Sequence, residues 1–462
     1  MNSAQPQNKM GVMPIDKLVI SMSAPMMVSM LIQALYNVVD SIFVARITDL
    51  NDFPLRAVSM AFPAQSLMIA VSVGTGVGVN ALLSRRLGAK DFKGANQVAT
   101  TGVFLAFCSY LVFALLGIFL VKPFFEVQVA DVADAVEKVA IIEYGWQYLS
   151  ICMIASFGIF FQIIFERLLQ STGKTLLTMC TQGIGAIVNI IFDPIFIFVF
   201  DLGVAGAALA TVLGQIVAMI LAIIFNLKLN KEVKVNFRSL FKADGKTILA
   251  IYGIALPSII MQSIGSVMVF TLNKILGSLD GQAITVFGIY FKLQSFVFMP
   301  VMGLNNGLVP IVAYNYGAEN RKRIIQTVKC ASLYALVIMT VGMAIIQIFP
   351  KPILSLFNPP EAIEQMSILA LRIISTHFVL AAISIVLSST FQALGKAVFS
   401  MLVSIARQLV VLLPAAFLLS LTGNVNNVWW AFPIAEVMSL AMCLIFFVYI
   451  YKKMISKIPS NS

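Results

Sequence analysis

The sequence predicts an all-α polytopic membrane protein with twelve transmembrane helices, arranged as two six-helix bundles related by an internal repeat. Of the 462 residues, 60% are hydrophobic and 11% are charged, whereas soluble domains are roughly 25% charged. Runs of about 20 residues with few or no charges, long enough to cross a bilayer, recur along the whole chain. Because a soluble domain cannot bury this much apolar surface, we expect the chain to be embedded in a membrane.

The apolar runs divide into six and six. They begin near residues 18, 57, 98, 139, 175, 202, 247, 283, 326, 366, 397 and 427. The first six form a predicted N-terminal lobe, residues 18–228, and the last six form a C-terminal lobe, residues 247–451. The longest polar break in the chain, a basic linker at residues 229–246, separates the lobes, and polar termini occupy residues 1–17 and 452–462.

The two halves share short motifs in the same order. "GAKDFKGANQ" begins at Gly88 in the first half, and "GAENRKRIIQ" begins at Gly317 in the second. "QSTGK", which begins at Gln170, returns as "QALGK", which begins at Gln392. Pro25 in the first run also has a counterpart in the seventh. Motifs that recur in order at a nearly constant offset indicate a duplicated six-helix unit in parallel orientation.

The positive charges predict the orientation in the membrane. A formal net charge of +11 would suit a nucleic-acid partner, but most of the 31 Lys and Arg residues fall in connections on one side, Arg167 among them. The positive-inside rule then places both termini in the cytoplasm. We therefore expect a multi-pass protein of the cell membrane that acts as a monomer and binds no nucleic acid.

Two aspartates interrupt the apolar runs of the first half. Asp40 lies in the first run and Asp193 in the fifth, and the position equivalent to Asp193 in the second half is Ala415. Both runs head outward, and Asp40 stands roughly 9 Å from its outer end at 1.5 Å per residue, with Asp193 at a similar depth. Ionisable side chains are costly inside a bilayer and mostly mark ion or substrate routes. We therefore expect the pair to be functional.

Further oxygen-bearing groups share this depth. Two precede Asp40 by three and four residues, one precedes Asp193 by four and so shares its helix face, and one lies early in the sixth run. These side chains are Asn37, Tyr36, Asn189 and Thr211. Pro194 has no amide hydrogen, so it also frees the carbonyl of Ile190 and weakens the helix.

The cluster can bind either of two ions. A carboxyl group in apolar surroundings favours its neutral form, and a second carboxyl group nearby strengthens proton binding. The same oxygens can hold Na⁺, by analogy with the oxygen preference of other hard cations. A structural role is the alternative, in which each acid only pairs with an intramembrane cation or a helix carbonyl. Sequence alone does not choose between H⁺ and Na⁺.

Other ionisable residues within the runs receive no assigned role. These are Lys292, Arg372, Arg407 and Glu436. The single histidine, His377, has no partner at ligand spacing, and we expect it to be a core residue. Because no hydrolytic, redox or cofactor-binding motif is present, we expect a protein that is not an enzyme and carries no cofactor, with no metal ion beyond Na⁺ at the Asp40 cluster.

Several segments carry a resemblance to a known family. They are "QALYNVVDSIFVAR" in the first run, "ERLLQSTGK" and "NIIFDPIFIF" before and within the fifth, and "GLVPIVAYNYGAENRKR" after the eighth. With their order on a duplicated twelve-helix chain, the sequence resembles the multidrug and toxic compound extrusion (MATE) transporters over essentially its whole length. The similarity is strongest to the branch of DinF-type and staphylococcal-like multidrug exporters.

The resemblance implies two lobes that alternate between inward-open and outward-open states and export organic cations as H⁺ or Na⁺ enters a prokaryotic cell. The family's cation site falls on Asp40, Asn189, Asp193 and Thr211, and Pro25 matches a helix 1 proline proposed to bend that helix. The sodium-coupled branch has an acid in helix 7, which this chain lacks. Ion coupling is therefore expected in the N-terminal lobe.

The substrates are expected to be lipophilic organic cations. Some of the 23 methionines and 35 phenylalanines can line a cavity whose walls adapt to differently shaped guests. The sequence does not identify the substrate-binding residues. A flippase for lipid-linked saccharides remains the alternative, and it would need a groove lined by Arg or Lys. A major-facilitator carrier is disfavoured because "SRRLGAKDFKGANQ" lacks the signature of that family's loop after helix 2.

Overall fold

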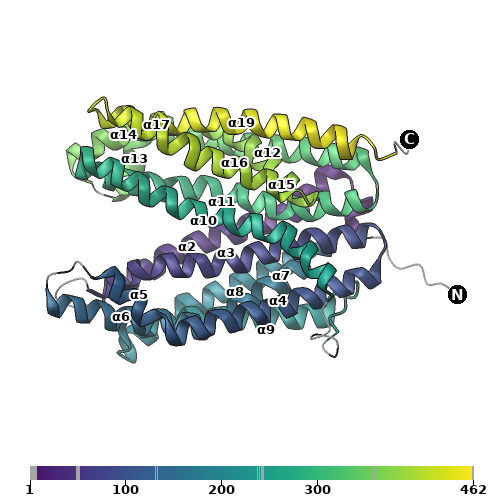
Figure 1. Cartoon of the computed structure of the whole chain (residues 1–462), viewed down its shortest axis with the longest axis horizontal. Coiled ribbons are helices and arrows are strands. Elements are labelled where there is room, and N and C mark those ends of the chain that lie inside the picture. The colour runs from purple at the N-terminus through teal and green to yellow at the C-terminus, as the bar shows by residue number, and fades with distance from the viewer. Residues whose placement is uncertain are drawn as a thin grey trace. The chain divides into compact units, whose positions relative to one another are not determined.

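The computed structural model describes residues 8–47, 53–130, 132, 134–236, 238, 240, 244–357 and 359–459, apart from the side chains of Asn37, Ser41 and Ala45. These described residues form helices and connecting turns, with no strand among them (Figure 1). Helices are expected for a chain in lipid, because each backbone amide and carbonyl must find its hydrogen-bond partner within its own segment.

The membrane crossings number up to twelve. Ten helical segments of the described chain are long and apolar enough to span a bilayer, and two bent helix pairs bring the total to twelve. Each predicted run begins within or next to one of these segments. In the N-terminal half the segments are α2 (Ile15–Ala45), α3 (Phe53–Gly88), α4 (Phe92–Phe119), the bent pair α6 (Ala135–Ile154) and α7 (Phe157–Ser171), α8 (Thr175–Pro194) continued by η1 (Ile195–Val199), and α9 (Gly203–Leu229).

The C-terminal half repeats this order. Its segments are α10 (Gly245–Leu279), α11 (Gly281–Gly317), α12 (Arg321–Ile348), the bent pair α14 (Glu361–Ser375) and α15 (Phe378–Ala393), α16 (Ala397–Ile405) continued by η4 (Ala406–Leu412) and α17 (Leu413–Ser420), and α18 (Val425–Val428) followed by α19 (Ala431–Ile450) and η5 (Tyr451–Ile455). Short helices complete the chain: α1 (Lys9–Val12), α5 (Val121–Gln128), α13 (Pro350–Leu354) and η3 (Ser355–Phe357).

The repeat seen in the motifs is also present in the backbone. The ends of α3 and α11 are separated by the same offset as the ends of α4 and α12, which is the spacing from Gly88 to Gly317. The connections match as well, because Lys90 and Glu319 both have positive φ (58° and 54°). Asp91 and Asn320 then cap the next helix through a side-chain oxygen that accepts from a backbone N–H three residues on.

The later helices of the two halves match at the spacing of the "QSTGK" and "QALGK" motifs. The first residues of α8 and α16 are separated by this offset, and so are those of α9 and α18. Gly173 and Gly395, within the two motifs, both take positive φ (83° and 75°), a conformation that favours glycine. The bends in α6–α7 and α14–α15, of 41° and 49°, also fall at equivalent places. The sequence predicted a single run in each case and gave no indication of the bend.

The chain divides into two compact units, and three of the four boundaries between them lie inside long helices. One unit contains the described residues of Val28–Leu83 and Asp91–Ile259, and the other contains those of Met1–Met27, Ser84–Lys90 and Ile260–Ser462. In α2 and α10 the boundary falls within three residues of Pro25 and of Pro257. Proline interrupts the helical hydrogen-bond ladder. In both helices the boundary between the units therefore lies next to a weakened part of the helix. The lobe boundaries predicted from the sequence, at 228 and 247, remain a prediction.

The repeated glycines Gly88 and Gly317 allow a reciprocal backbone contact. A Cβ atom on Gly88 would collide with the carbonyl of Tyr314, and a Cβ atom on Gly317 would collide with the carbonyl of Arg85. Each carbonyl lies three residues before the other glycine. The Arg85 guanidinium also lies 4.8 Å from the centre of the Tyr316 ring. The ends of α3 and α11 therefore meet backbone to backbone, which only small residues permit.

We expect Gly317→Ala to lower the free energy of unfolding by about 1–3 kcal/mol, the usual cost of overpacking. Gly288→Ala on the same helix is the matched control, because a Cβ atom there meets nothing within 4 Å and alanine favours helix. Thermal unfolding of the purified protein in detergent measures both. Equal melting temperatures for the two variants would show that the contact does not require glycine.

Candidate functional site

The two predicted aspartates lie together in the structure. Asp40 in α2 and Asp193 at the end of α8 are within hydrogen-bond reach of each other. Asp193 is fully buried. The oxygens Asp40 Oδ1 and Asp193 Oδ2 are buried and accept no hydrogen bond from a donor among the described residues. Two carboxyl groups so placed cannot both stay charged without a proton or cation between them.

Asn189 and Thr211 extend this cluster. The Asn189 amide nitrogen lies 3.4 Å from Asp193 Oδ1 and 3.4 Å from the Thr211 hydroxyl oxygen. Its own carbonyl oxygen is buried without a partner among the described residues. Thr211 lies on α9, so the cluster draws on three helices. The unpaired oxygens of Asp40, Asn189 and Asp193 are the kind of ligands that a proton or a hard cation satisfies.

Of the two supporting residues predicted from the sequence, one can be placed. Tyr36 lies one helical turn before Asp40, close enough to interact electrostatically with both carboxyl groups. The side chain of Asn37 lies outside the described residues. Near the C-terminal end of α2, the Phe43 and Phe198 rings meet edge to face, with centroids 6.4 Å apart. This contact holds α2 against the π-helical segment η1 that follows Pro194.

Two cavities adjoin the cluster. One, of about 490 Å³, includes Asp40 in its wall, and the other, of about 170 Å³, includes Asn189. Both share Tyr36 and Thr211 in their walls. Further shared side chains are Gln33, Ile69, Ile159 and Gln215. The aspartate pair is therefore adjacent to space that water, ions or a guest can occupy.

The smaller cavity contains an acid that sequence reasoning missed. Glu166 on α7 is only 2% exposed, and its carboxylate accepts hydrogen bonds from three side chains. The donor atoms are Gln162 Nε2 at 3.1 Å, Thr181 Oγ1 at 2.8 Å and Gln182 Nε2 at 2.6 Å. Gln182 in turn contacts Ser29 on α2. The apolar run "GIFFQIIF" that leads directly into Glu166 was the available signal.

Arg167 requires a correction. It was predicted in a cytoplasmic connection, but it lies on α7, is 7% exposed, and lines the smaller cavity. Its Nη1 atom donates to the Gln170 side-chain oxygen at 2.7 Å. The prediction failed because the polar segment "ERLLQSTGK" reads as a loop, whereas α7 continues to Ser171. Burial with polar partners is what allows a cation to remain inside the helix bundle.

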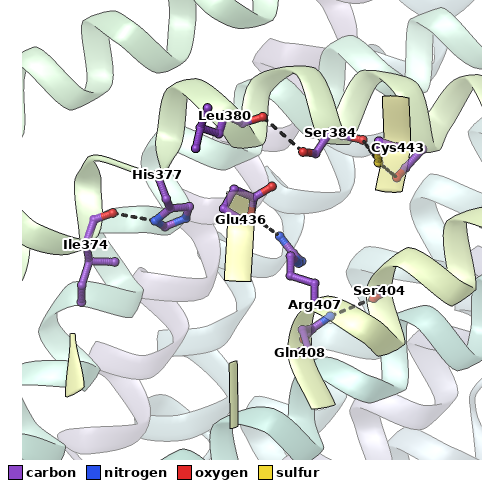
Figure 2. A network of polar contacts seen from close by, with 10 residues as sticks. Ile374, His377, Leu380, Ser384, Ser404, Arg407, Gln408, Glu436 and Cys443 are labelled. Atoms are coloured by element: carbon purple, nitrogen blue, oxygen red, sulfur yellow. Dashed lines mark hydrogen bonds and ion pairs between the residues drawn. The ribbon is translucent and has the colours of Figure 1, made fainter. Parts of the chain in front are cut away.

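The ionisable residues of the C-terminal half lie apart from this cluster in sequence and form their own contacts. Arg407 on η4 pairs with Glu436 on α19 at 3.2 Å (Figure 2). His377 is buried and its Nδ1 atom lies 2.6 Å from the Ile374 carbonyl oxygen, as expected for a core residue. Lys292 and Arg372 are exposed. In the described residues, no group of three or more His, Cys, Asp and Glu side chains is arranged to hold a metal ion.

The sequence matches a family model across most of its length. The MatE family model matches residues 25–195 and 257–418. The chain is 27% identical over 423 residues to the multidrug export protein MepA of Staphylococcus aureus strain MRSA252, covering 92% of this chain and 91% of that protein. It is 28% identical over 435 residues to MepA of Staphylococcus haemolyticus, covering 94% and 93%.

Solved transporter structures share the fold. An outward-facing conformation of a multidrug resistance MATE family transporter of the MOP superfamily superposes with a TM-score of 0.89, at 24% identity over 98% of this chain and 99% of that chain. A MOP superfamily transporter from Pyrococcus furiosus, described as having reversed polarity of its binding pocket that suggests a different function, superposes at 0.86, with 25% identity over 97% and 99%.

We expect Glu166→Ala to lower the free energy of unfolding by about 1–3 kcal/mol, because it removes the buried acceptor that the Gln162, Thr181 and Gln182 side chains share. Glu126→Ala on α5 is the control, since the Glu126 side chain is exposed. Thermal unfolding in detergent compares the two. If both variants melt with the parent protein, the Glu166 network does not stabilise the bundle.

Proposed function

The chain belongs to the MatE family and is a multidrug efflux transporter, and from that premise we propose that it exports lipophilic organic cations in exchange for H⁺ or Na⁺ bound at Asp40 and Asp193. One observation carries the proposal: two facing carboxyl groups, each with an unsatisfied buried oxygen, lie beside a cavity in a predominantly apolar helix bundle. Such a pair gains a favourable interaction from any cation that reaches it.

The coupling follows from competition for the same negative charge. When the pair is deprotonated and empty, it attracts an organic cation in the adjoining cavities. Entry of H⁺ or Na⁺ from outside neutralises the pair, so the attraction is lost and the drug is released outward. An ion can shift a transporter between states only through different affinities for them. A carboxyl pair that binds one cation at a time supplies that difference.

Two prolines are placed to transmit the change. Pro194 follows Asp193 directly and is succeeded by a π-helical turn, a local irregularity often found at functional sites. Pro25 lies several turns before Asp40 in α2, next to the boundary between the compact units. We propose that both act as hinges, because each interrupts the hydrogen bonding of a helix that carries a coupling aspartate.

The chain is a multi-pass protein of the cell membrane, and we propose that both of its termini face the cytoplasm. The asymmetry of Lys and Arg in the connections supports this orientation, even with Arg167 removed from the count. We also propose that one chain is the working unit, because both six-helix repeats are present within it. Small organic molecules and the bilayer are the expected partners.

A flippase for lipid-linked saccharides is the second candidate, and the structure gives it less support. Recognition of a lipid phosphate needs free cationic side chains. In the C-terminal half, the charge of Arg407 is offset by Glu436 at 3.2 Å, and the exposed Lys292 and Arg372 lie on different helices, α11 and α14. The Asp40 and Asp193 pair would repel a phosphate and attract a cation.

We expect Asp193→Asn and Asp40→Asn each to abolish gradient-driven export, because an amide cannot exchange a proton or balance a bound cation. Asp201→Asn is the matched control: Asp201 is an exposed aspartate at the outer end of the same segment, and its φ of 53° is one that asparagine also tolerates. Efflux of ethidium from cells making equal amounts of each variant measures the effect. Normal efflux by Asp193→Asn would contradict the assignment.

We expect one ion gradient alone to drive transport in liposomes without ATP. Vesicles loaded with acid or with Na⁺, diluted into the opposite condition, should accumulate ethidium as the coupled ion leaves. The active gradient identifies the ion, and vesicles without protein provide the background. If neither gradient moved any of several cationic dyes, antiport would be wrong and flipping of a lipid-linked saccharide would be tested next.

A further inference from the structure

The C-terminal half contains an ion pair with unequal exposure. Arg407 Nη1 lies 3.2 Å from Glu436 Oε2, and the Glu436 side chain is 2% exposed whereas that of Arg407 is 31% exposed (Figure 2). Arg407 therefore contacts the buried Glu436 carboxylate while its own side chain stays partly exposed. Arg407 also lies in a π-helical stretch, η4, where the backbone is less regular than in an α-helix. Of the two partners, the arginine is the one that can leave.

The arginine does not satisfy the carboxylate completely. Glu436 Oε1 is buried without a hydrogen-bond partner among the described residues. The hydroxyl of Tyr290, a residue that is 1% exposed, is buried in the same unpaired state, and it is close enough to interact electrostatically with both Glu436 and Arg407. Unsatisfied buried polar groups are rare and costly, and each calls for an explanation. Here two such groups lie around one ion pair.

A cluster of aromatic rings surrounds Phe432, one helical turn from this carboxylate. Phe432 lies one helical turn before Glu436 on α19. Its ring centre is 5.7 Å from that of Tyr290, 6.1 Å from that of Phe287 and 6.1 Å from that of His377. Aromatic faces attract organic cations, and the attraction is strongest where water is excluded. A buried carboxylate one helical turn from such a ring cluster is the chemistry that recognises a flat, lipophilic cation.

The internal repeat identifies what occupies the equivalent place in the N-terminal half. At the spacing that relates "QSTGK" to "QALGK", Arg407 corresponds to Gly185 and Glu436 to Gly214. These glycines pack on each other: a Cβ atom on Gly214 would lie 2.6 Å from the Gly185 carbonyl oxygen. Both line the cavity of about 170 Å³. Where one half has the wall of a cavity, the other half has a charged pair.

We propose that Glu436 is a second binding site for organic cations and that Arg407 occupies it as an attached cation. The Arg407 guanidinium, itself flat and delocalised, neutralises Glu436 when no guest is present. A flat organic cation takes its place against Glu436 and the Phe432 and Tyr290 rings, and Arg407 turns away through its exposed side. The proposal rests on the proposed function only in taking organic cations as guests, and it is independent of the coupling ion.

The test measures ethidium binding to purified protein in the Asp193→Asn background, which removes the charge at the first site. Adding Arg407→Ala removes the competing cation and should tighten ethidium binding by about tenfold or more, as a desolvated cation gains beside a carboxylate and aromatic rings. Adding Glu436→Gln to that variant should abolish the gain. Lys292→Ala, which removes an exposed cation from α11, should leave the affinity unchanged.

Two outcomes would overturn the proposal: an unchanged affinity in the Arg407→Ala variant, or a gain that persists with Glu436→Gln. Arg407→Gln retains most of the side chain and is used if the alanine variant does not fold. With it, ethidium should raise the melting temperature, and Glu436→Gln should remove that rise. A failure here leaves gradient-driven transport intact, whereas a failure of antiport in liposomes leaves this binding measurable.

Discussion

The cost of placing a charge in the hydrocarbon layer is the constraint on which the rest of this structure depends. Three acidic sites meet that cost to different degrees. Glu166 accepts hydrogen bonds from three side chains, Glu436 has one oxygen paired and one without a partner among the described residues, and Asp40 and Asp193 each retain an unsatisfied oxygen. Satisfied buried polar groups rigidify a bundle, and unsatisfied ones are costly. The degree of satisfaction is therefore what distinguishes Glu166 from the acids that we propose to bind cations.

The two repeats use one backbone plan for different chemistry. Helix ends, capping residues and left-handed turns recur at fixed offsets, so the path of the chain is shared. The side chains placed on it are not shared. The aspartate pair has no acidic counterpart in the C-terminal half, and the positions equivalent to Arg407 and Glu436 in the N-terminal half are Gly185 and Gly214. Duplication thus supplied a scaffold, and substitutions at a few positions gave each half its own polar site.

The sequence was sufficient for the helices and for most of the aspartate cluster. Long apolar runs leave few alternatives to a helix in lipid. Helix geometry places residues four apart on one face, so the sequence predicts that Asn189 and Asp193 lie together. The approach of Asp40 to Asp193 was less certain, because depth does not fix the rotation of a helix. The bends near residues 155 and 376, and the burial of Glu166 and Arg167, were missed. The burial of Glu166 depends partly on Thr181 and Gln182, which lie on the next helix and outside a local window.

The contact between Gly88 and Gly317 is symmetric. Each glycine meets the carbonyl three residues before the other, so the two partners exchange the same roles. This is the geometry of an isologous interface, in which one surface patch binds its own copy across a two-fold axis. A homodimer of six-helix subunits would build the whole contact from a single glycine. In a single chain the same contact uses two glycines, and because each one excludes a side chain from the same narrow approach, a substitution at either position disturbs both halves of the contact.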